Sequence, residues 1–165
     1  MQSAVIPLIP SAVRAQSVIV EAHIHRLELF LYDQTKLALP EAYRPLHCGL
    51  LRIAGSGAFG WAEFEFSDGA AQLDLIKWGQ VFRHLKRRQA AEAFAMIHQY
   101  EQQWGFTRTH LAAEALASWQ KALSESSDTP SSESIRRHIH HMAGMTVPPT
   151  EREFLSYYCQ SYYSF

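Results

Sequence analysis

The sequence predicts an α+β fold, in which a small three-stranded antiparallel sheet is followed by a bundle of three helices. Three observations predict it. Apolar residues recur with a period of two early in the chain, which is typical of strands. A Gly-rich turn at residues 55–57 separates two short apolar runs, which indicates a hairpin. From Leu73 onward the apolar period becomes that of a helix.

The composition is that of a globular domain without a strong net charge. The chain has 165 residues, 47% of them hydrophobic and 19% charged, so it can bury one sizeable core. Its net charge of −1 gives no general attraction to nucleic acid or anionic lipid. No apolar run approaches the ~20 residues of a membrane span, and the first residues lack the basic start of a signal peptide. Cys48 and Cys159 are too few for a disulfide framework, so we expect a cytoplasmic protein. From the charge and the lack of a long apolar run, we expect no nucleic-acid or membrane partner.

Three strands are expected before residue 67. In residues 18–31, VIVEAHIHRLELFL, apolar and polar residues alternate, which predicts a strand with one buried face. Residues 32–48 contain two prolines and several polar residues, and we expect them to form a long loop. Residues 49–55, GLLRIAG, and 58–66, AFGWAEFEF, are expected to pair as a hairpin whose glycines supply the positive φ of the turn.

Three helices are expected between residues 73 and 123, and each is indicated by an apolar stripe at helical spacing. The stripes are Leu75, Trp78, Phe82 and Leu85; then Ala93, Ile97, Tyr100 and Trp104; then Ala112, Leu116, Trp119 and Leu123. Gly105 is the expected stop of the second helix. The basic run at 84–89, HLKRRQ, is expected to close the first helix, where cations suit the helix dipole.

Composition divides the chain into four parts. Residues 1–17 are expected to be a flexible N-terminal arm, because two prolines interrupt an apolar run. Residues 18–123 form the predicted α+β domain, and the Ser-rich acidic stretch 124–134 is expected to be a linker. Residues 135–165 are expected to form a helical tail rich in His and Tyr, in which Thr150 and Glu153 supply a capping box for the last helix.

Two stretches of the predicted domain resemble the N-terminal capping domain of the enolase superfamily, in its mandelate racemase and muconate lactonizing enzyme form. Residues 23–31, HIHRLELFL, resemble its first strand. Residues 50–64, LLRIAGSGAFGWAEF, resemble its second and third strands, with Gly57, Gly60, Trp61 and Glu63 in the matching places and Ala62 where a glycine is usual. The stretch FTRTHLAAEALASWQKAL is similar to its last helix. The resemblance covers about residues 18 to 123.

The resemblance implies a capping domain without its catalytic partner. Enzymes of this superfamily hold their Mg²⁺ carboxylates and acid–base residues in a (β/α) barrel, which takes ~250 residues. Only 42 residues (165 − 123) follow Leu123 here. We therefore expect a non-catalytic binding or interaction protein that self-associates and needs no cofactor, with structural roles for Trp61 and Glu63. The alternative is an accessory subunit that completes the active site of a separately encoded barrel enzyme acting on a carboxylate substrate.

Residues 32–47 occupy the place of the loop that closes over substrate in the superfamily. Lys36, Tyr43 and Arg44 are the candidate ligand-binding residues, since they could hold a small anionic molecule, the Arg by a bidentate fork. The alternative is a solvated connection with ordinary surface charge. In the accessory-subunit hypothesis this loop would supply substrate specificity.

Two groups among the nine histidines have a spacing that can hold a metal ion. His23 and His25 share one strand face, but no third ligand is in view, so we expect them to be half-buried surface residues. His138 and His141 are three residues apart on the predicted tail helix and are a weak candidate for Zn²⁺ or Ni²⁺. The two arginines beside them would repel a cation, so a basic helix that contacts anions or responds to pH is an equal alternative.

The predicted last helix carries an apolar, aromatic face formed by Phe154, Leu155, Tyr158 and Tyr162. A capping domain without its barrel would leave an apolar surface exposed, and such surfaces mark interfaces. Aromatic side chains bury large areas and dominate interfaces. We therefore expect residues 150–165 to cover that surface, either by folding back on their own domain or by docking on a second copy.

Overall fold

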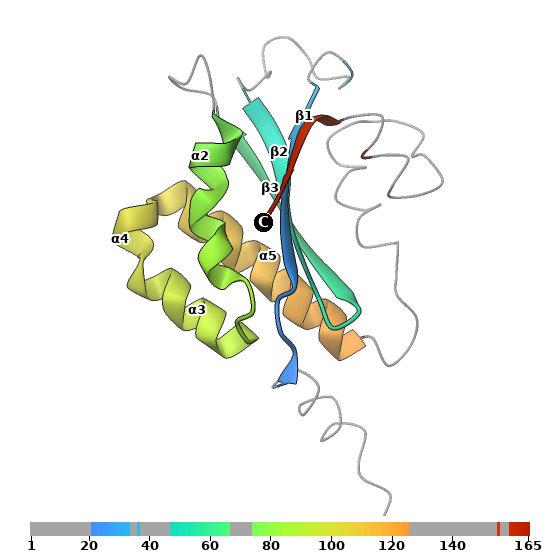
Figure 1. The fold of residues 1–165 in the computed structure, drawn as a ribbon, viewed down its shortest axis with the longest axis vertical. Helices are drawn as coiled ribbons and strands as arrows, with labels where there is room; N and C mark the ends of the chain where they lie inside the picture. The colour runs from blue at the N-terminus through green and yellow to red at the C-terminus, as the bar shows by residue number, and fades with distance from the viewer. Residues whose placement is uncertain (1–20, 34–35, 37–46, 67–73, 126–154, 156–158) are drawn as a thin grey trace, which may run out of the picture.

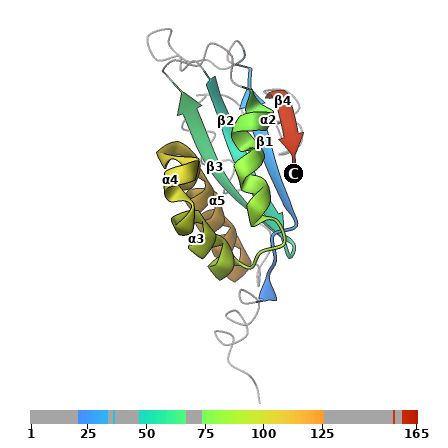
Figure 2. The same ribbon diagram turned by 60° about the vertical axis from the view of Figure 1, so that its left-hand side comes forward.

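The computed structural model describes residues 21–33, 36, 47–66, 74–125, 155 and 159–165, and the findings below concern these residues (Figure 1). They form a four-stranded antiparallel sheet with the helices on one side of it, seen from two directions in Figures 1 and 2. The strands are β1 (Arg26–Tyr32), β2 (His47–Gly55), β3 (Ala58–Phe66) and β4 (Cys159–Ser164). Their order across the sheet is β3-β2-β1-β4. The predicted α+β class is confirmed at this level.

The hairpin of β2 and β3 forms as predicted. Its two-residue turn consists of Ser56 and Gly57, with φ angles of 50° and 79°. A turn with positive φ at both central positions matches the right-handed twist of the flanking strands, which is why it is favoured in two-residue hairpins. The prediction that glycines supply the positive φ is correct for Gly57, whereas Ser56 adopts it without being a glycine.

β1 begins later than predicted and is buried on both faces. Residues 22–25 alternate between buried and exposed as expected, but they lie before the strand, where His23 makes an isolated bridge with Gln89. From Leu27 to Tyr32 every residue is buried, so the prediction of a single buried face is wrong for β1. The reason is its position, because β1 has a strand on each side and packed side chains above and below it.

The prediction of three strands is wrong, because β4 adds a fourth. β4 pairs antiparallel with β1, from Glu28 opposite Ser164 to Tyr32 opposite Cys159. The helical tail expected over 135–165 therefore does not extend over these last residues. Tyrosine favours strands, and pairing with the edge of β1 satisfies backbone donors and acceptors that a helix would satisfy within itself.

The helices follow the predicted order but are divided differently. The first predicted helix consists of α2 (Leu75–Gly79) and the 3₁₀ helix η2 (Gln80–Leu85), and the second consists of α3 (Ala90–Gln99) and α4 (Glu101–Trp104). Gly105 ends α4 with a φ of 77°, as predicted. The third helix, α5 (Phe106–Glu125), is continuous, and its whole predicted stripe is buried.

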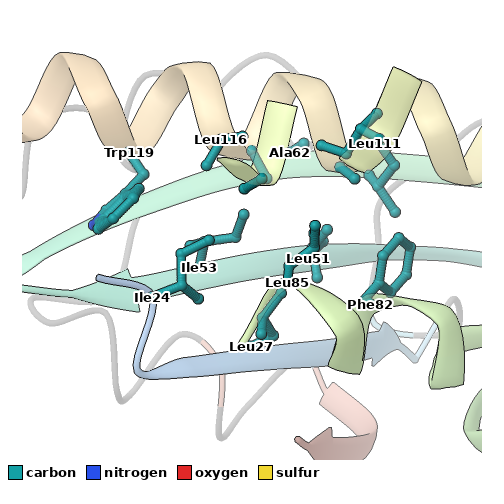
Figure 3. Close-up of a cluster of buried hydrophobic side chains, with 14 of the residues drawn as sticks. Ile24, Leu27, Leu51, Ile53, Ala62, Phe82, Leu85, Leu111, Leu116 and Trp119 are labelled. Atoms are coloured by element: carbon teal, nitrogen blue, oxygen red, sulfur yellow. The ribbon is translucent and has the colours of Figure 1, made fainter. Parts of the chain in front are cut away.

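The core lies between the helices and the side of the sheet that they cover (Figure 3). Figure 3 labels the buried residues Ile24, Leu27, Leu51, Ile53, Ala62, Phe82, Leu85, Leu111, Leu116 and Trp119. The indole of Trp119 also needs a hydrogen-bond partner, because a buried N–H without one is costly. Its Nε1 donates to the backbone oxygen of Gly55 at 3.0 Å.

Gly60 allows α5 to pack directly on β3. A Cβ at this position would lie 2.2 Å from the backbone oxygen of Ala115 and 2.3 Å from the backbone nitrogen of Trp119, so a larger residue does not fit. The backbone nitrogen of Trp61 also donates to the hydroxyl of Ser118 at 3.1 Å. These contacts fix α5 on one side of the sheet and leave the opposite side to the residues described next.

Candidate binding surface on the outer face of the sheet

The side of the sheet that faces away from the helices, here called the outer face, carries Glu28, Arg52 and several aromatic side chains of the strands. Side chains alternate between the two faces of a strand, so Leu27 and Leu29 belong to the core while Glu28 belongs to the outer face. Strand pairing places Arg52 of β2 opposite Glu28 of β1 and also opposite Trp61 of β3. Three neighbouring strands thus contribute to one site.

Glu28 is a buried carboxylate at the centre of this site, with only 2% of its surface exposed. Its Oε2 is paired with Nε of Arg52, and its Oε1 accepts a hydrogen bond from the hydroxyl of Tyr162 at 2.8 Å. Nε of Arg26 lies 3.5 Å from the same Oε1. The carboxylate therefore has partners on β1, β2 and β4, as a buried charge requires.

The partners of Glu28 keep its carboxylate ionised. Burial by itself would raise the pKa, because it disfavours the charged form. The hydrogen bonds from Arg52 and Tyr162, together with the positive charges of Arg52 and Arg26, outweigh burial and lower the pKa of Glu28 from its ordinary value of 4.5. A carboxylate held ionised in this way is a poor general acid or base at neutral pH.

The guanidinium of Arg52 lies among three aromatic rings. Its Cζ is 5.1 Å from the ring centroid of Phe59, 5.1 Å from that of Trp61 and 5.6 Å from that of Phe30. A cation within about 6 Å of a ring face is attracted by the ring's quadrupole. Arg52 is thus held from one side by a carboxylate and from others by aromatic rings.

Part of this aromatic surface is exposed. Phe59 is 41% exposed and Tyr162 is 52% exposed, and Trp61 is half-buried. We call these three residues, together with Glu28 and Arg52, the aromatic patch. It presents large apolar rings around a charge pair that is already balanced.

Beside the aromatic patch the outer face continues as a buried apolar cluster. Its buried members are Phe30, Tyr32, Cys48 and Leu50, and Leu155 and Cys159 pack against them. Burial raises the pKa of the Cys48 thiol to about 11 and that of Cys159 to about 12. Both thiols are therefore protonated at neutral pH, and a protonated thiol is a weak nucleophile.

The candidate ligand-binding residues lie mostly outside the described part of the chain. Tyr43 and Arg44 are not among the described residues. Lys36 is described, and its Nζ lies 3.8 Å from the carboxylate of Asp33. That carboxylate opposes the attraction of Lys36 for an anionic ligand.

Trp61 and Glu63 both lie on β3, in the places that the sequence analysis gives them on the third strand. Trp61 is half-buried, and its ring lies on the outer face beside Arg52. Glu63 is half-buried and stands opposite Leu50 of β2.

The histidines do not assemble a metal centre in the described ranges. His23 and His25 are exposed rather than half-buried, and Nδ1 of His23 lies 2.8 Å from the backbone oxygen of Glu21. His138 and His141 lie outside the described residues. Among the residues that the structure describes, no group of three His, Cys, Asp or Glu side chains is placed to hold a metal ion.

The residues predicted for the interface are divided between described and undescribed positions. Phe154 and Tyr158 lie outside the described residues. Leu155 packs on the buried apolar cluster, and Tyr162 bonds to Glu28. Residues 159–165 therefore fold back on their own sheet, which is one of the two arrangements that the sequence left open.

The sequence analysis missed Glu28 and Arg52 as site residues. A signal was present, because each is a single charged residue inside an apolar strand run, HRLELFL and GLLRIAG. Charged residues are almost never fully buried unless they are paired. Two opposite charges in strands predicted to be neighbours would therefore have indicated a buried pair.

Comparison with family models, with curated proteins and with solved structures found no match to this chain. The resemblance to the enolase-superfamily capping domain therefore stays a prediction. Each helix in the described ranges is too short or too polar to cross a bilayer.

Proposed function

We propose that this chain is a non-catalytic binding module that associates with a second copy of itself through the aromatic patch, on a domain that resembles an isolated enolase-superfamily cap. The observation that carries the proposal is the exposure of Phe59 and Tyr162 on either side of the balanced Glu28–Arg52 pair. Aromatic residues and Arg are enriched at protein interfaces, where they supply most of the binding energy.

The balanced charge makes the aromatic patch suitable for burial against a neutral partner. An unpaired cation would lose its hydration on association without compensation. Arg52 already has a carboxylate and three rings as partners, so a second copy does not have to supply a counter-charge. The rings of Phe59 and Tyr162 can then contribute their apolar area to the interface.

The chemistry of the described residues supports a binding role over catalysis. The lowered pKa of Glu28 holds its carboxylate ionised and tied to Arg52 and Tyr162. The thiols of Cys48 and Cys159 are protonated at neutral pH. None of these groups combines a suitable pKa with a free position next to a reacting molecule.

The proposal is tested by measuring the mass of the purified chain in solution over a range of concentrations, by light scattering or sedimentation. We expect a dimer whose dissociation constant rises at least about ten-fold in Phe59→Ser, because a residue that dominates an interface contributes about 2 kcal/mol or more and about 1.4 kcal/mol is ten-fold in affinity. The matched control is Phe106→Ser, because Phe106 is 78% exposed but lies on α5. A wild-type chain that stays monomeric, or equal effects of the two variants, would overturn the proposal.

The alternative proposal is an accessory subunit that completes the active site of a separately encoded barrel enzyme. The arrangement that favours it is the succession of three antiparallel strands and then helices on one side of the sheet, which is what the resemblance implies. It predicts that the tagged chain captures a barrel-type enzyme from its own cell and restores turnover of a carboxylate substrate. Capture of only further copies of the chain would favour self-association instead.

A further inference from the structure

The edge of β1 is paired with β4 along its length. We infer that this edge and the side chains beside it, here called the groove, bind the β4 segment of a second copy, so that two copies associate by exchanging residues 159–165. The inference rests on the proposed self-association and deepens it, because it names the segment that is recognised and the groove that recognises it.

The backbone of β4 binds β1 as an added strand. The pairing runs from Glu28 to Tyr32 on β1, and the backbone nitrogen of Phe165 donates to the backbone oxygen of Leu27 at 2.9 Å. Extended peptides bind exposed sheet edges in the same way, with main-chain hydrogen bonds for affinity and pockets for alternate side chains for specificity.

On the outer face, Tyr162 supplies the first specific contact. Its hydroxyl donates to the buried carboxylate of Glu28, and its ring centroid lies 5.1 Å from that of Phe30. A site that hydrogen-bonds a hydroxyl with a buried polar group discriminates strongly against a segment that lacks the hydroxyl. The groove is therefore selective for tyrosine at this position.

On the inner face, Phe165 supplies the second specific contact. It packs against the core, and its ring centroid lies 4.7 Å from that of Tyr163. Gly79 at the end of α2 makes room for it, because a Cβ there would lie 2.2 Å from Cδ1 of Leu29 and 2.8 Å from Cζ of Phe165. The groove thus recognises two aromatic residues, three positions apart and on opposite faces of the strand.

The chain has enough length to place this segment on another copy. Residues 126–154 join α5 to Leu155, and 29 residues can span on the order of 95 Å when fully extended. A domain of this size is about 40 Å across. Exchange keeps every contact of β4 while changing only which copy supplies it, so its main cost is the entropy of association. It also brings Tyr162 of one copy into the aromatic patch of the other.

The test uses a fluorescent peptide of residues 159–165 and full-length protein, with binding followed by anisotropy under reducing conditions. In Phe165→Ala the chain's own strand is weakened while the groove is intact, so we expect it to bind the peptide at least about ten-fold tighter than wild type. Adding Gly79→Ala narrows the groove and should remove that gain. Phe106→Ala, on α5, should bind like wild type. Circular dichroism establishes that each variant is folded.

Equal peptide affinity of Phe165→Ala and wild type would overturn the inference, as would equal binding of a scrambled peptide. Measuring the mass of the wild-type protein separates this failure from that of the proposed function. A stable wild-type dimer whose Phe165→Ala variant binds the peptide no more tightly than wild type would leave the self-association standing and overturn the exchange. A monomer that binds the peptide selectively would support the groove and overturn the self-association.

Discussion

Glu28 occupies a strand position whose neighbours, Leu27 and Leu29, are both core residues, and its partners determine what its burial costs. Removing a charge from water costs several kcal/mol, and only close partners repay it. Arg52 and Tyr162 provide those partners from two other strands. The burial of Glu28 is therefore compensated only when β1, β2 and β4 are in register.

Glu28 should make the stability of the protein depend on pH. Its pKa is lowered in the folded state, so its ionised form adds stability above the ordinary value of 4.5, and this stability is lost as the pH falls through the folded pKa. Glu28→Gln should reduce the free energy of unfolding by about 3 kcal/mol at pH 7, because it leaves Arg52, whose side chain is only 13% exposed, without its counter-charge. We expect the difference from wild type to narrow below pH 4.5, as measured by urea unfolding at several pH values.

The matched control for this experiment is Glu114→Gln. Glu114 is an exposed carboxylate on α5, and its neighbour is His110 one turn away. Exposed pairs of this kind contribute less than about 1 kcal/mol, so the pH profile of this variant should run parallel to that of wild type. A Glu28→Gln profile that also runs parallel to wild type would show that the ionised form of Glu28 adds no stability.

Among the elements, the contact between α5 and β3 is the one that depends most clearly on a single residue. The stripe of α5 buries Ala112, Leu116 and Trp119 against the sheet. Gly60 is the place on β3 where the helix backbone comes closest. The free energy of this contact therefore depends on the absence of a side chain on the strand as much as on the apolar stripe of the helix.

Substitution Gly60→Ala should destabilise the fold by about 3 kcal/mol, the upper end of the usual cost of overpacking. The added Cβ would meet backbone atoms of Ala115 and Trp119, and backbone cannot move aside without shifting the helix. Chemical unfolding monitored by circular dichroism measures the loss. Gly57→Asn is the control, since nothing lies within 4 Å of a Cβ at Gly57 and Asn tolerates positive φ. Equal losses in the two variants would show that the packing at Gly60 is not the cause.

Elements whose signals are local were predictable from the sequence, whereas those that depend on distant partners were not. The stripe of α5 and the Ser56–Gly57 turn are set by residues close in sequence, and both were predicted in place. In β4, Tyr162 also fits a helical apolar spacing. The segment forms a strand because it pairs with β1. Tyr162 and Glu28 are 134 positions apart, so no local pattern contains that pairing. The aromatic patch could not be predicted for the same reason, because its residues come from four strands that are far apart in the sequence.

At the scale of the whole molecule, stability among the described strands and helices should be lowest at β4. The strand lies at one edge of the sheet, and most of its residues are exposed. The other three strands pack against the helices through the large core cluster on their inner face. Regions with few buried apolar contacts open before the molecule unfolds as a whole.

Hydrogen exchange measured by mass spectrometry should therefore show residues 159–164 exchanging at least about ten-fold faster than β1 and β2, since local opening costs less than global unfolding. Phe165→Ala should accelerate exchange in β4 much more than in α5, because the ring of Phe165 lies beside Gly79 of α2 and its backbone bonds to Leu27. Uniform protection of all four strands would contradict this order of stabilities.

The position of β4 beside β1 also affects how the protein is made. The ribosome delivers β1, β2, β3 and the helices before β4, whose first residue follows the end of α5 by 34 positions. Domains tend to fold as their sequence emerges, so for part of each round of translation the nascent chain would display β1 with one side unfilled. On a polysome, the unpaired β1 edge of one nascent chain lies close to other chains that are being made. Pairing between two copies would therefore be established during synthesis rather than after release.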